Sequence, residues 1–396
     1  MSSLKIVAVH NRYQQRGGED EVFEAEAQLL SDHGCTVRTI AEPASNPQGL
    51  RQKFDVALNS IWSKRSHTRF QEILREEKPD VVHVHNFFPA ISPSLYYACR
   101  EAQVPVVQTL HNYRLVCPAA TFYRDGHVCE ECLGSSPWRG VRHGCYRDSR
   151  LGTAALAAMI QTHRSRNTWT EMVDCYITLT EFAREKMIAG GLPAEKVTVK
   201  PNFILKDPGR RTKRGEYALF VGRLADLKGI PTMLAAWHRL GEPVPLVIAG
   251  DGPFRQQMEL EIARQGLTNI LYRGRLSRPD TLDAMRNARF LMFPSEWYEG
   301  FPMTIVEAFA CGLPVICSRL GSMQEIVTDG LTGVHFNAGD ADDLAAKVQW
   351  AWNHAPETDA MGCAARREFE ARYTAARNYE LLIDIYERVM NACVCA

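Results

Sequence analysis

Short apolar runs alternate with helical stretches along the whole chain, and this alternation limits the possible fold more than any other feature. Brief runs rich in Val, Ile and Leu, bounded by polar or glycine-containing turns, are typical of strands buried on both faces of a parallel sheet. Two series of such runs are present: 5–9, 37–40, 81–85, 106–110, 175–179 and 197–200, and then 217–221, 244–249, 270–272, 290–293, 315–317 and 333–336. Helical stretches lie between them, for example over 19–33, 230–240 and 254–265. This order predicts an α/β chain of two doubly wound, Rossmann-like domains.

A polar, basic stretch from Pro201 to Arg214 separates the two series and is typical of an interdomain linker. The length of 396 residues also fits two domains, each large enough to bury a core. We therefore expect an N-terminal domain over 1–200, a C-terminal domain over 201–374, and a final helix within 375–396.

Composition excludes several classes of protein. With 45% hydrophobic and 23% charged residues and no formal net charge, the chain lacks the basic excess of a nucleic-acid-binding protein. No apolar run reaches the roughly 18 residues of a membrane span, and a charged loop follows the first apolar run where a signal peptide would have its cleavage site. We therefore expect a cytoplasmic protein. The sequence also lacks a Gly-x-Gly-x-x-Gly after a strand and a Walker motif, which disfavours a dinucleotide-dependent oxidoreductase or a P-loop kinase.

One strand-to-helix turn of the second series carries two carboxylates. The apolar strand 290–293 stops at Pro294, Glu299 falls in the turn, and Glu307 falls in the first turns of the helix that begins near Pro302. Open α/β sheets bind ligands at the carboxyl ends of their strands, and a helix N-terminus offers free N–H groups to phosphate. The turn is therefore a candidate site for a sugar nucleotide, although exposed Glu residues are also common on solvated surfaces.

Two basic residues occupy the corresponding turn after the first strand of the same series. Arg223 follows the strand 217–221, and Lys228 lies at the start of the next helix. Fixed cations at the end of a strand suit a diphosphate. Two acids and two bases at such turns favour a binding site over a chance arrangement.

Three motifs together make the pattern specific: Gly222-Arg223-Leu224 with Lys228-Gly229, then Gly250-Asp251-Gly252-Pro253, and then Glu299-Gly300-Phe301-Pro302 with Glu307-Ala308. In combination they resemble the retaining family 4 glycosyltransferases of the GT-B fold, the glycosyl transferases group 1. Gly17-Gly18-Glu19 is similar to the glycine loop after the first strand of that family, and Thr109-Leu110-His111-Asn112 is similar to its central histidine motif. The resemblance covers nearly the whole chain. It implies two Rossmann-like domains facing a cleft, with a C-terminal helix that crosses back to the N-terminal domain.

The resemblance implies transfer of a hexosyl unit from an NDP-sugar, a UDP- or GDP-hexose, to a saccharide or lipid-linked saccharide in surface polysaccharide biosynthesis. The anomeric configuration would be retained. Arg223 and Lys228 would stabilise the departing diphosphate. The remaining donor contacts implied are Glu307 to the ribose, Glu299 to the sugar, Gly300, Phe301 and Pro302 beside them, and Leu276 to the base. The only Asp-x-Asp, beginning at Asp340, is predicted to cap a helix, so we expect no catalytic metal.

Further candidates lie in the first domain. The resemblance places Gly17 and Gly18 over the donor diphosphate and His111, as a catalytic residue, beside the transferred sugar. His10, His85 and Asn86 fall at strand ends, from which they could line an acceptor cleft or serve a structural role.

Two other functions fit the same residues. One is an NDP-sugar 2-epimerase of GT-B fold, and the other is a non-catalytic, zinc-bearing binding subunit. The presence of Arg223, Lys228, Glu299 and Glu307 argues against a degenerate, non-catalytic scaffold.

Four cysteines are concentrated in the loop-rich segment 115–146: Cys117, Cys129, Cys132 and Cys145. A Cys-x2-Cys knuckle with one further cysteine on each side can place four thiolates around a tetrahedral Zn²⁺. The spacing therefore predicts a structural zinc site, with disulfides or four ordinary thiols as alternatives. The family motifs do not include this segment.

A basic, amphipathic stretch lies between Leu50 and Phe70. Phe54, Leu58, Ile61 and Trp62 recur at helical spacing, and Asp55 is the one acid among five basic residues: Arg51, Lys53, Lys64, Arg65 and Arg69. Such a helix either packs on its own core or docks on an anionic membrane surface. The second interpretation predicts peripheral contact with the inner face of a membrane that holds a lipid-linked acceptor.

Overall fold

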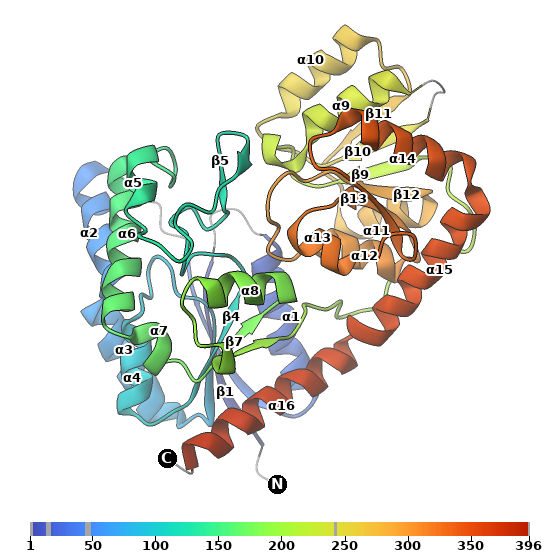
Figure 1. The fold of residues 1–396 in the computed structure, drawn as a ribbon. Coiled ribbons are helices and arrows are strands. Elements are labelled where there is room, and N and C mark those ends of the chain that lie inside the picture. The colour runs from blue at the N-terminus through green and yellow to red at the C-terminus, as the bar shows by residue number, and fades with distance from the viewer. Residues whose placement is uncertain (1–2, 13–16, 44–48, 241–243, 395–396) are drawn as a thin grey trace. The chain divides into compact units, whose positions relative to one another are not determined.

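A computed structural model describes residues 3–12, 17–43, 49–240 and 244–394 and shows two compact α/β units (Figure 1). Unit 1 comprises the described residues up to Phe122, Cys129–Asn202 and the segment from Ala376 onward. Unit 2 comprises Tyr123–Val128 and Phe203–Ala375. Each unit contains a six-stranded sheet in which every pair of neighbouring strands is parallel, which confirms the predicted α/β class.

The sheet of unit 1 has the strand order β2-β1-β3-β4-β7-β8. Its strands are β1 (Lys5–Asn11), β2 (Thr36–Glu42), β3 (Val81–Asn86), β4 (Val106–Leu110), β7 (Cys175–Thr178) and β8 (Val197–Val199). The second strand of the chain pairs on one side of β1 and the third strand on the other. The winding therefore reverses between β1 and β3, and doubly wound folds bind ligands at such a switch point.

The helices of unit 1 are α1 (Gly18–Asp32), α2 (Gly49–Ile61), α3 (Lys64–Glu77), α4 (Ser94–Glu101), α5 (Arg139–His143), α6 (Arg150–Ser165), α7 (Thr168–Glu171), α8 (Glu181–Ala189) and α16 (Ala375–Val394). The last helix, α16, lies beside this unit (Figure 1). Its Leu382 and Tyr386 belong to the same buried cluster as Ile6 and Val81 of the sheet. This apolar contact explains why the end of the chain groups with its beginning.

The sheet of unit 2 has the order β11-β10-β9-β12-β13-β14, with its switch point between β9 and β12. Its strands are β9 (Ala218–Val221), β10 (Leu246–Ala249), β11 (Ile270–Gly274), β12 (Phe290–Phe293), β13 (Val315–Ser318) and β14 (Gly333–Phe336). Its helices are α9 (Ile230–Arg239), α10 (Arg255–Gln265), α11 (Arg278–Asn287), α12 (Met303–Ala310), α13 (Gly321–Ile326), α14 (Ala341–Asn353) and α15 (Ala355–Arg372). Leu219 faces one core cluster and its neighbours Ala218 and Phe220 face another. Burial on both faces is why these strands are continuous apolar runs in the sequence.

The structure differs from the sequence prediction in several places. A two-stranded antiparallel hairpin, β5 (Tyr123–Arg124) and β6 (His127–Val128), and the short helix α5 fall in the segment expected to be loop. β1 and β3 each run past their predicted ends, so His10 and Asn86 lie inside strands. The predicted cap at Asp340 is confirmed, because its carboxylate accepts from the Asp342 and Asp343 N–H groups at the start of α14. No helix within the described ranges is long and apolar enough to cross a membrane.

Candidate active site

Lys228 and Glu299 form an ion pair at the switch point of unit 2. Lys228 lies in the loop after β9 and Glu299 in the loop after β12, and its ammonium donates to Glu299 Oε1 at 2.6 Å. The Ser295 hydroxyl, at 2.6 Å, and the Trp297 Nε1–H, at 2.9 Å, donate to the same oxygen. The Glu299 side chain is only 8% exposed. Three donors on one buried carboxylate oxygen fix the orientation of Glu299 and place the ammonium of Lys228 beside it.

The glycine after Lys228 lets the two loops approach each other. Gly229 has φ +68°, and a Cβ atom there would lie 1.9 Å from the Pro294 carbonyl oxygen. The Glu296 N–H also donates to the Leu227 carbonyl at 2.9 Å, which ties the loops together. A side chain at Gly229 would push the β9 loop away from the β12 loop, so the Lys-Gly pair of the motif is needed for the ion pair.

Two further glycines hold the loop that carries Arg223. Cβ atoms at Gly250 and Gly252 would lie 1.8 Å and 2.3 Å from the carbonyl oxygens of Gly222 and Leu224. The Leu224 N–H donates to the Asp251 carbonyl at 3.0 Å. Backbone contacts at Gly222 and Leu224 therefore fix the residues on either side of Arg223. The Arg223 side chain is exposed and lies five positions before Lys228.

The other predicted donor contacts surround the start of α12. Pro302 is the N-cap residue of this helix, and Gly300 and Phe301 before it are half-buried. Glu307, on the helix, lies with its Oε1 3.2 Å from the Arg278 guanidinium. Leu276 is half-buried in the turn between β11 and α11. These predicted residues all lie in turns that follow the strands of unit 2 or in the first turns of the next helix.

In unit 1, His111 contacts another histidine. His111 follows β4, and its Nε2 atom lies 3.0 Å from His85 Nδ1 of β3. Both rings are buried and stacked, with centroids 5.3 Å apart. Burial, and secondarily the charge of His85, lowers the pKa of His111 well below its usual range. His111 is therefore a neutral imidazole at neutral pH.

The three residues predicted to line an acceptor cleft, His10, His85 and Asn86, are buried in unit 1. His10 is fully buried, stacks on Phe23, and lies 3.0 Å from the Asp20 carboxylate. His85 and Asn86 line a small cavity of about 20 Å³ together with His111. The acceptor role of His10, His85 and Asn86 stays a prediction, and their burial also fits the structural role that the sequence left open.

Gly17 and Gly18 begin α1. Gly17 is the N-cap residue of this helix, with an extended backbone at φ −130°. Its N–H donates to Asp20 at 3.0 Å. The four residues before Gly17, at 13–16, lie outside the described residues.

The four cysteines of segment 115–146 come together in unit 1 as free thiols. Burial, and then the neighbouring thiols of Cys117, Cys145 and Cys129, raises the pKa of Cys132 to about 11. The Gly140 N–H donates to the Pro137 carbonyl at 3.2 Å, which begins the short helix α5 beside this group. The knuckle follows the hairpin, and the Cys129 N–H donates to the Phe122 carbonyl at 2.8 Å. Residues that are far apart in the sequence are thus gathered around Cys132.

Two family models match consecutive parts of the chain. The glycosyl transferase 4-like domain matches residues 16–202, and glycosyl transferases group 1 matches residues 203–368. The chain belongs to the group 1 glycosyl transferases of the GT-B fold.

Curated relatives of this glycosyl transferase include a mannosyltransferase and a rhamnosyltransferase. It is 26% identical over 185 residues to O-antigen chain mannosyltransferase C of Escherichia coli, covering 46% of this chain and 49% of that protein. It is 28% identical over 168 residues to D-rhamnosyltransferase WbpZ of Pseudomonas aeruginosa, covering 42% and 44%. These matches therefore span about half the length of the relatives.

Solved structures share the fold of this glycosyl transferase over their full length. A glycosyltransferase from Rickettsia africae aligns with a TM-score of 0.70 at 16% identity, covering 98% of this chain and 99% of that one. Anabaena HepE in complex with UDP aligns with a TM-score of 0.67 at 16% identity, covering 97% and 100%. At such identity the likeness shows the fold alone.

Sequence reasoning missed several residues that hold the site of this glycosyl transferase. Ser295 and Trp297, which orient Glu299, lie in the same turn and could have been found by their polar groups alone. Glu26 and Lys200 gave a weaker signal. Glu26 interrupts the buried face of α1, and Lys200 ends the apolar run that forms β8.

Proposed function

We propose that the chain transfers a hexosyl unit from a nucleoside-diphosphate sugar to a hydroxyl acceptor, with retention of the anomeric configuration. The observation that carries the proposal is the Lys228–Glu299 pair at the switch point of unit 2, with Arg223 in the same loop. A doubly wound sheet binds nucleotides at this point, and two cations there suit a diphosphate.

Each residue has a distinct role in this proposal. Arg223 and Lys228 stabilise the negative charge that builds on the diphosphate as it departs. Glu299 holds Lys228 through Oε1 and accepts sugar hydroxyls through its other oxygen. Glu307 binds the ribose hydroxyls, and Leu276 contacts the base.

The relatives suggest the class of donor and acceptor. A mannosyltransferase and a rhamnosyltransferase are among them, and HepE was solved with UDP. We therefore propose a UDP- or GDP-hexose as the donor and a saccharide or lipid-linked saccharide of surface polysaccharide biosynthesis as the acceptor. Unit 1 would serve the acceptor and the transferred sugar, through His111.

A panel of nucleotide sugars tests this function. We expect one UDP- or GDP-hexose to raise the melting temperature more than the others, and UDP or GDP to be released when a saccharide acceptor is added, also in EDTA. The anomeric proton in the NMR spectrum of the product then gives the stereochemistry, which should match the donor. Interconversion of the NDP-sugar without acceptor would identify a 2-epimerase instead. Absence of both binding and turnover across the panel would favour a non-catalytic subunit.

We also propose that α2 and α3 dock on an anionic membrane. Phe54 and Leu58 on α2 are 64% and 51% exposed, so they do not pack on the core as a purely structural helix requires. Trp62, directly after α2, is 38% exposed and suits a membrane interface. Three large apolar side chains on one exposed stretch form a surface fit for lipid.

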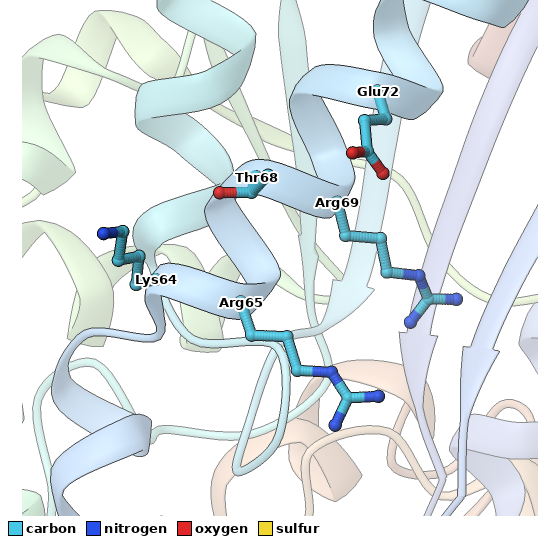
Figure 2. A pocket seen from close by; sticks show the side chains of 5 residues that line it. All are labelled: Lys64, Arg65, Thr68, Arg69 and Glu72. Atoms are coloured by element: carbon cyan, nitrogen blue, oxygen red, sulfur yellow. The ribbon is translucent and has the colours of Figure 1, made fainter.

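Basic side chains of α3 accompany this apolar surface. Lys64, Arg65, Thr68, Arg69 and Glu72 line an open depression of about 560 Å³, and Arg65 and Arg69 extend from the same side of the helix (Figure 2). Arg69 pairs with Glu42, whereas Lys64 and Arg65 form no ion pair with any described residue. Each such cation contributes about 1 kcal/mol near an anionic surface, so the proposed binding is reversible and salt-sensitive.

Co-sedimentation with phosphatidylserine vesicles tests the docking surface. We expect binding at low salt that falls at high salt, and that weakens in Phe54→Ser/Leu58→Ser and in Lys64→Ala/Arg65→Ala. Leu260→Ser serves as the control, because Leu260 is equally exposed at 65% but lies in unit 2. Equal binding by all variants, or none by the wild type, would leave a soluble acceptor as the better interpretation.

We propose finally that Cys117, Cys129, Cys132 and Cys145 bind a structural Zn²⁺. The grouping of the Cys117, Cys129 and Cys145 thiols around Cys132 is the observation that supports a thiolate site. Within the described chain, the four sulfurs do not all lie within 4.8 Å of one another, so binding would draw them closer.

Metal content tests the zinc proposal. We expect about one zinc per chain by elemental analysis, lost in Cys129→Ser/Cys132→Ser and retained in Cys99→Ser, a buried thiol outside the segment. Purified protein that contains no zinc and in which all four thiols react freely would show that they are ordinary cysteines.

A further inference from the structure

A chain of buried polar groups connects Lys200 to His111 across the switch point of unit 1. Lys200 Nζ lies 2.5 Å from Glu26 Oε1, and His85 Nε2 lies 3.2 Å from Glu26 Oε2. His85 Nδ1 completes the chain 3.0 Å from His111 Nε2. The four residues are each 7% exposed or less, and they come from the end of β8, α1, β3 and the turn after β4.

A metal ion does not fit this cluster. Glu26, His83 and His85 offer ligand atoms within 4.8 Å of one another, the one such group in the described part of the chain. The two ring nitrogens of His83, however, lie 2.7 Å from the Tyr386 hydroxyl and 2.8 Å from the Thr109 hydroxyl. Lys200 already balances the charge of Glu26. A divalent cation would add two charges to a buried site that has no second carboxylate.

The contacts instead determine where the protons lie. Burial opposes ionisation of Glu26, but the Lys200 ammonium, followed by His85, holds the pKa of the carboxyl well below its usual range. Ionised Glu26 can only accept hydrogen bonds. Its Oε2 atom has no partner of full hydrogen-bond geometry among the described residues, which leaves the His85 Nε2–H as the donor placed to satisfy it.

The position of the proton on His85 then determines the position of the proton on His111. With the proton of His85 on Nε2, the lone pair of this tautomer is on Nδ1, which accepts from His111 Nε2–H. His111 then has its lone pair on Nδ1. An imidazole with this tautomer can accept a hydrogen bond from a sugar hydroxyl.

We infer that Glu26 and His85 are positioning residues that hold His111 as a neutral imidazole with Nδ1 as the hydrogen-bond acceptor. The inference rests on the proposed function, in which His111 contacts the transferred sugar. It resembles the way in which a buried carboxylate fixes the tautomer of a catalytic histidine in a hydrolase triad. The charged or titratable groups that face His111 are His85, Glu26, His10 and Lys200.

Three variants separate positioning from structural support. His85→Leu removes both hydrogen bonds, whereas His85→Gln keeps one acceptor and one donor. His163→Leu is the control, because His163 is equally buried in unit 1 but its ring nitrogens contact Thr168 and Ile61. We expect kcat to fall about tenfold to a hundredfold in His85→Leu, with the donor KM unchanged, and to recover largely in His85→Gln. His163→Leu should keep the wild-type kcat.

The ¹⁵N NMR spectrum of labelled histidines provides a readout that does not depend on turnover. We expect the wild type to show His111 protonated on Nε2 down to acidic pH, and His85→Leu to show a mixture of tautomers. If His111 is protonated on Nε2 but the protein has no transferase activity, the proposed function is contradicted and the positioning of His111 by Glu26 and His85 still holds. A His111 ring with the proton on Nδ1, or a His85→Leu enzyme with wild-type kcat, would overturn the inference.

Discussion

At the residue scale, the site of unit 2 depends on one carboxylate oxygen with three donors. Glu299 Oε1 accepts from Lys228, Ser295 and Trp297. The negative charge of Glu299 therefore fixes the position of the Lys228 ammonium. Lys228 Nζ also lies 5.5 Å from the ring centroids of Phe293 and Trp297, which restrict it further. A cation held in place before the substrate binds loses little free energy to reorganisation when the diphosphate departs.

Glu299→Gln tests this arrangement because it keeps the shape of the side chain and removes its charge. We expect kcat/KM to fall at least about a hundredfold, or ~3 kcal/mol of transition-state stabilisation, since Lys228 is no longer held. The matched control is Glu296→Gln, three residues earlier, whose carboxylate accepts from the Thr232 hydroxyl instead. Steady-state kinetics on both variants is the measurement. A Glu299→Gln enzyme no slower than Glu296→Gln would show that Glu299 does not position Lys228.

Residues such as Glu299 and Lys228 could be predicted from the sequence because each follows an apolar strand and because the motifs are short and local. Their mutual contact, across 71 positions, could not be predicted by periodicity. The same limit applies to Glu26 and Lys200, which are 174 positions apart. The orientations of His10 and His85 could not be predicted either, since a strand end in the sequence does not show which polar side chains turn inward.

At the element scale, two strand-to-helix loops are held together by glycines. Gly229 and Gly252 each lie where a Cβ would overlap a backbone carbonyl of the neighbouring loop. The strands themselves were predictable because burial on both faces requires continuous apolar runs. The hairpin of β5 and β6 was not, because two-residue strands leave no periodic pattern.

Gly229→Ala tests the contact between the loops. We expect it to lower the free energy of unfolding by more than about 3 kcal/mol, because positive φ and overlap with Pro294 add together. Gly266→Ala is the control: Gly266 has nearly the same φ, +65°, at the end of α10, with nothing within 4 Å of an added Cβ. The free energy of unfolding of Gly266→Ala should fall by only about 1 kcal/mol, which is the cost of a positive φ at alanine. Urea unfolding of both variants gives the comparison, and equal losses would show that the overlap relaxes freely.

At the scale of the whole molecule, buried histidines make stability depend on pH. Burial lowers the pKa of His10 from 6.5 to about 4 and lowers those of His83 and His111 well below 6.5. Between pH 6.5 and about 4 the unfolded chain therefore binds protons that the folded chain does not. Stability is full above pH 6.5 and is lost as the pH falls through this window. The pKa of Glu26 is also lowered, so further stability is lost as the pH falls below 4.5.

Calorimetry at several pH values measures this effect. One pKa unit corresponds to about 1.4 kcal/mol, so we expect the melting temperature to fall by several degrees between pH 7.5 and pH 5.5. His238→Gln, at an exposed position on α9, should leave the pH dependence unchanged. A melting temperature that is constant over this range would show that the histidines are not buried as described.

The most direct test of the proposed function is the release of nucleoside diphosphate in EDTA by the wild type, Arg223→Ala and Lys228→Ala. Each substitution removes a cation from the loop after β9, so we expect kcat to fall about a hundredfold or more. Arg255→Ala should match the wild type, because Arg255 lies on the exposed face of α10 and pairs with Glu259 of the same helix. Wild-type rates in Lys228→Ala, or a wild-type enzyme strictly dependent on added Mg²⁺ or Mn²⁺, would contradict diphosphate stabilisation by Arg223 and Lys228.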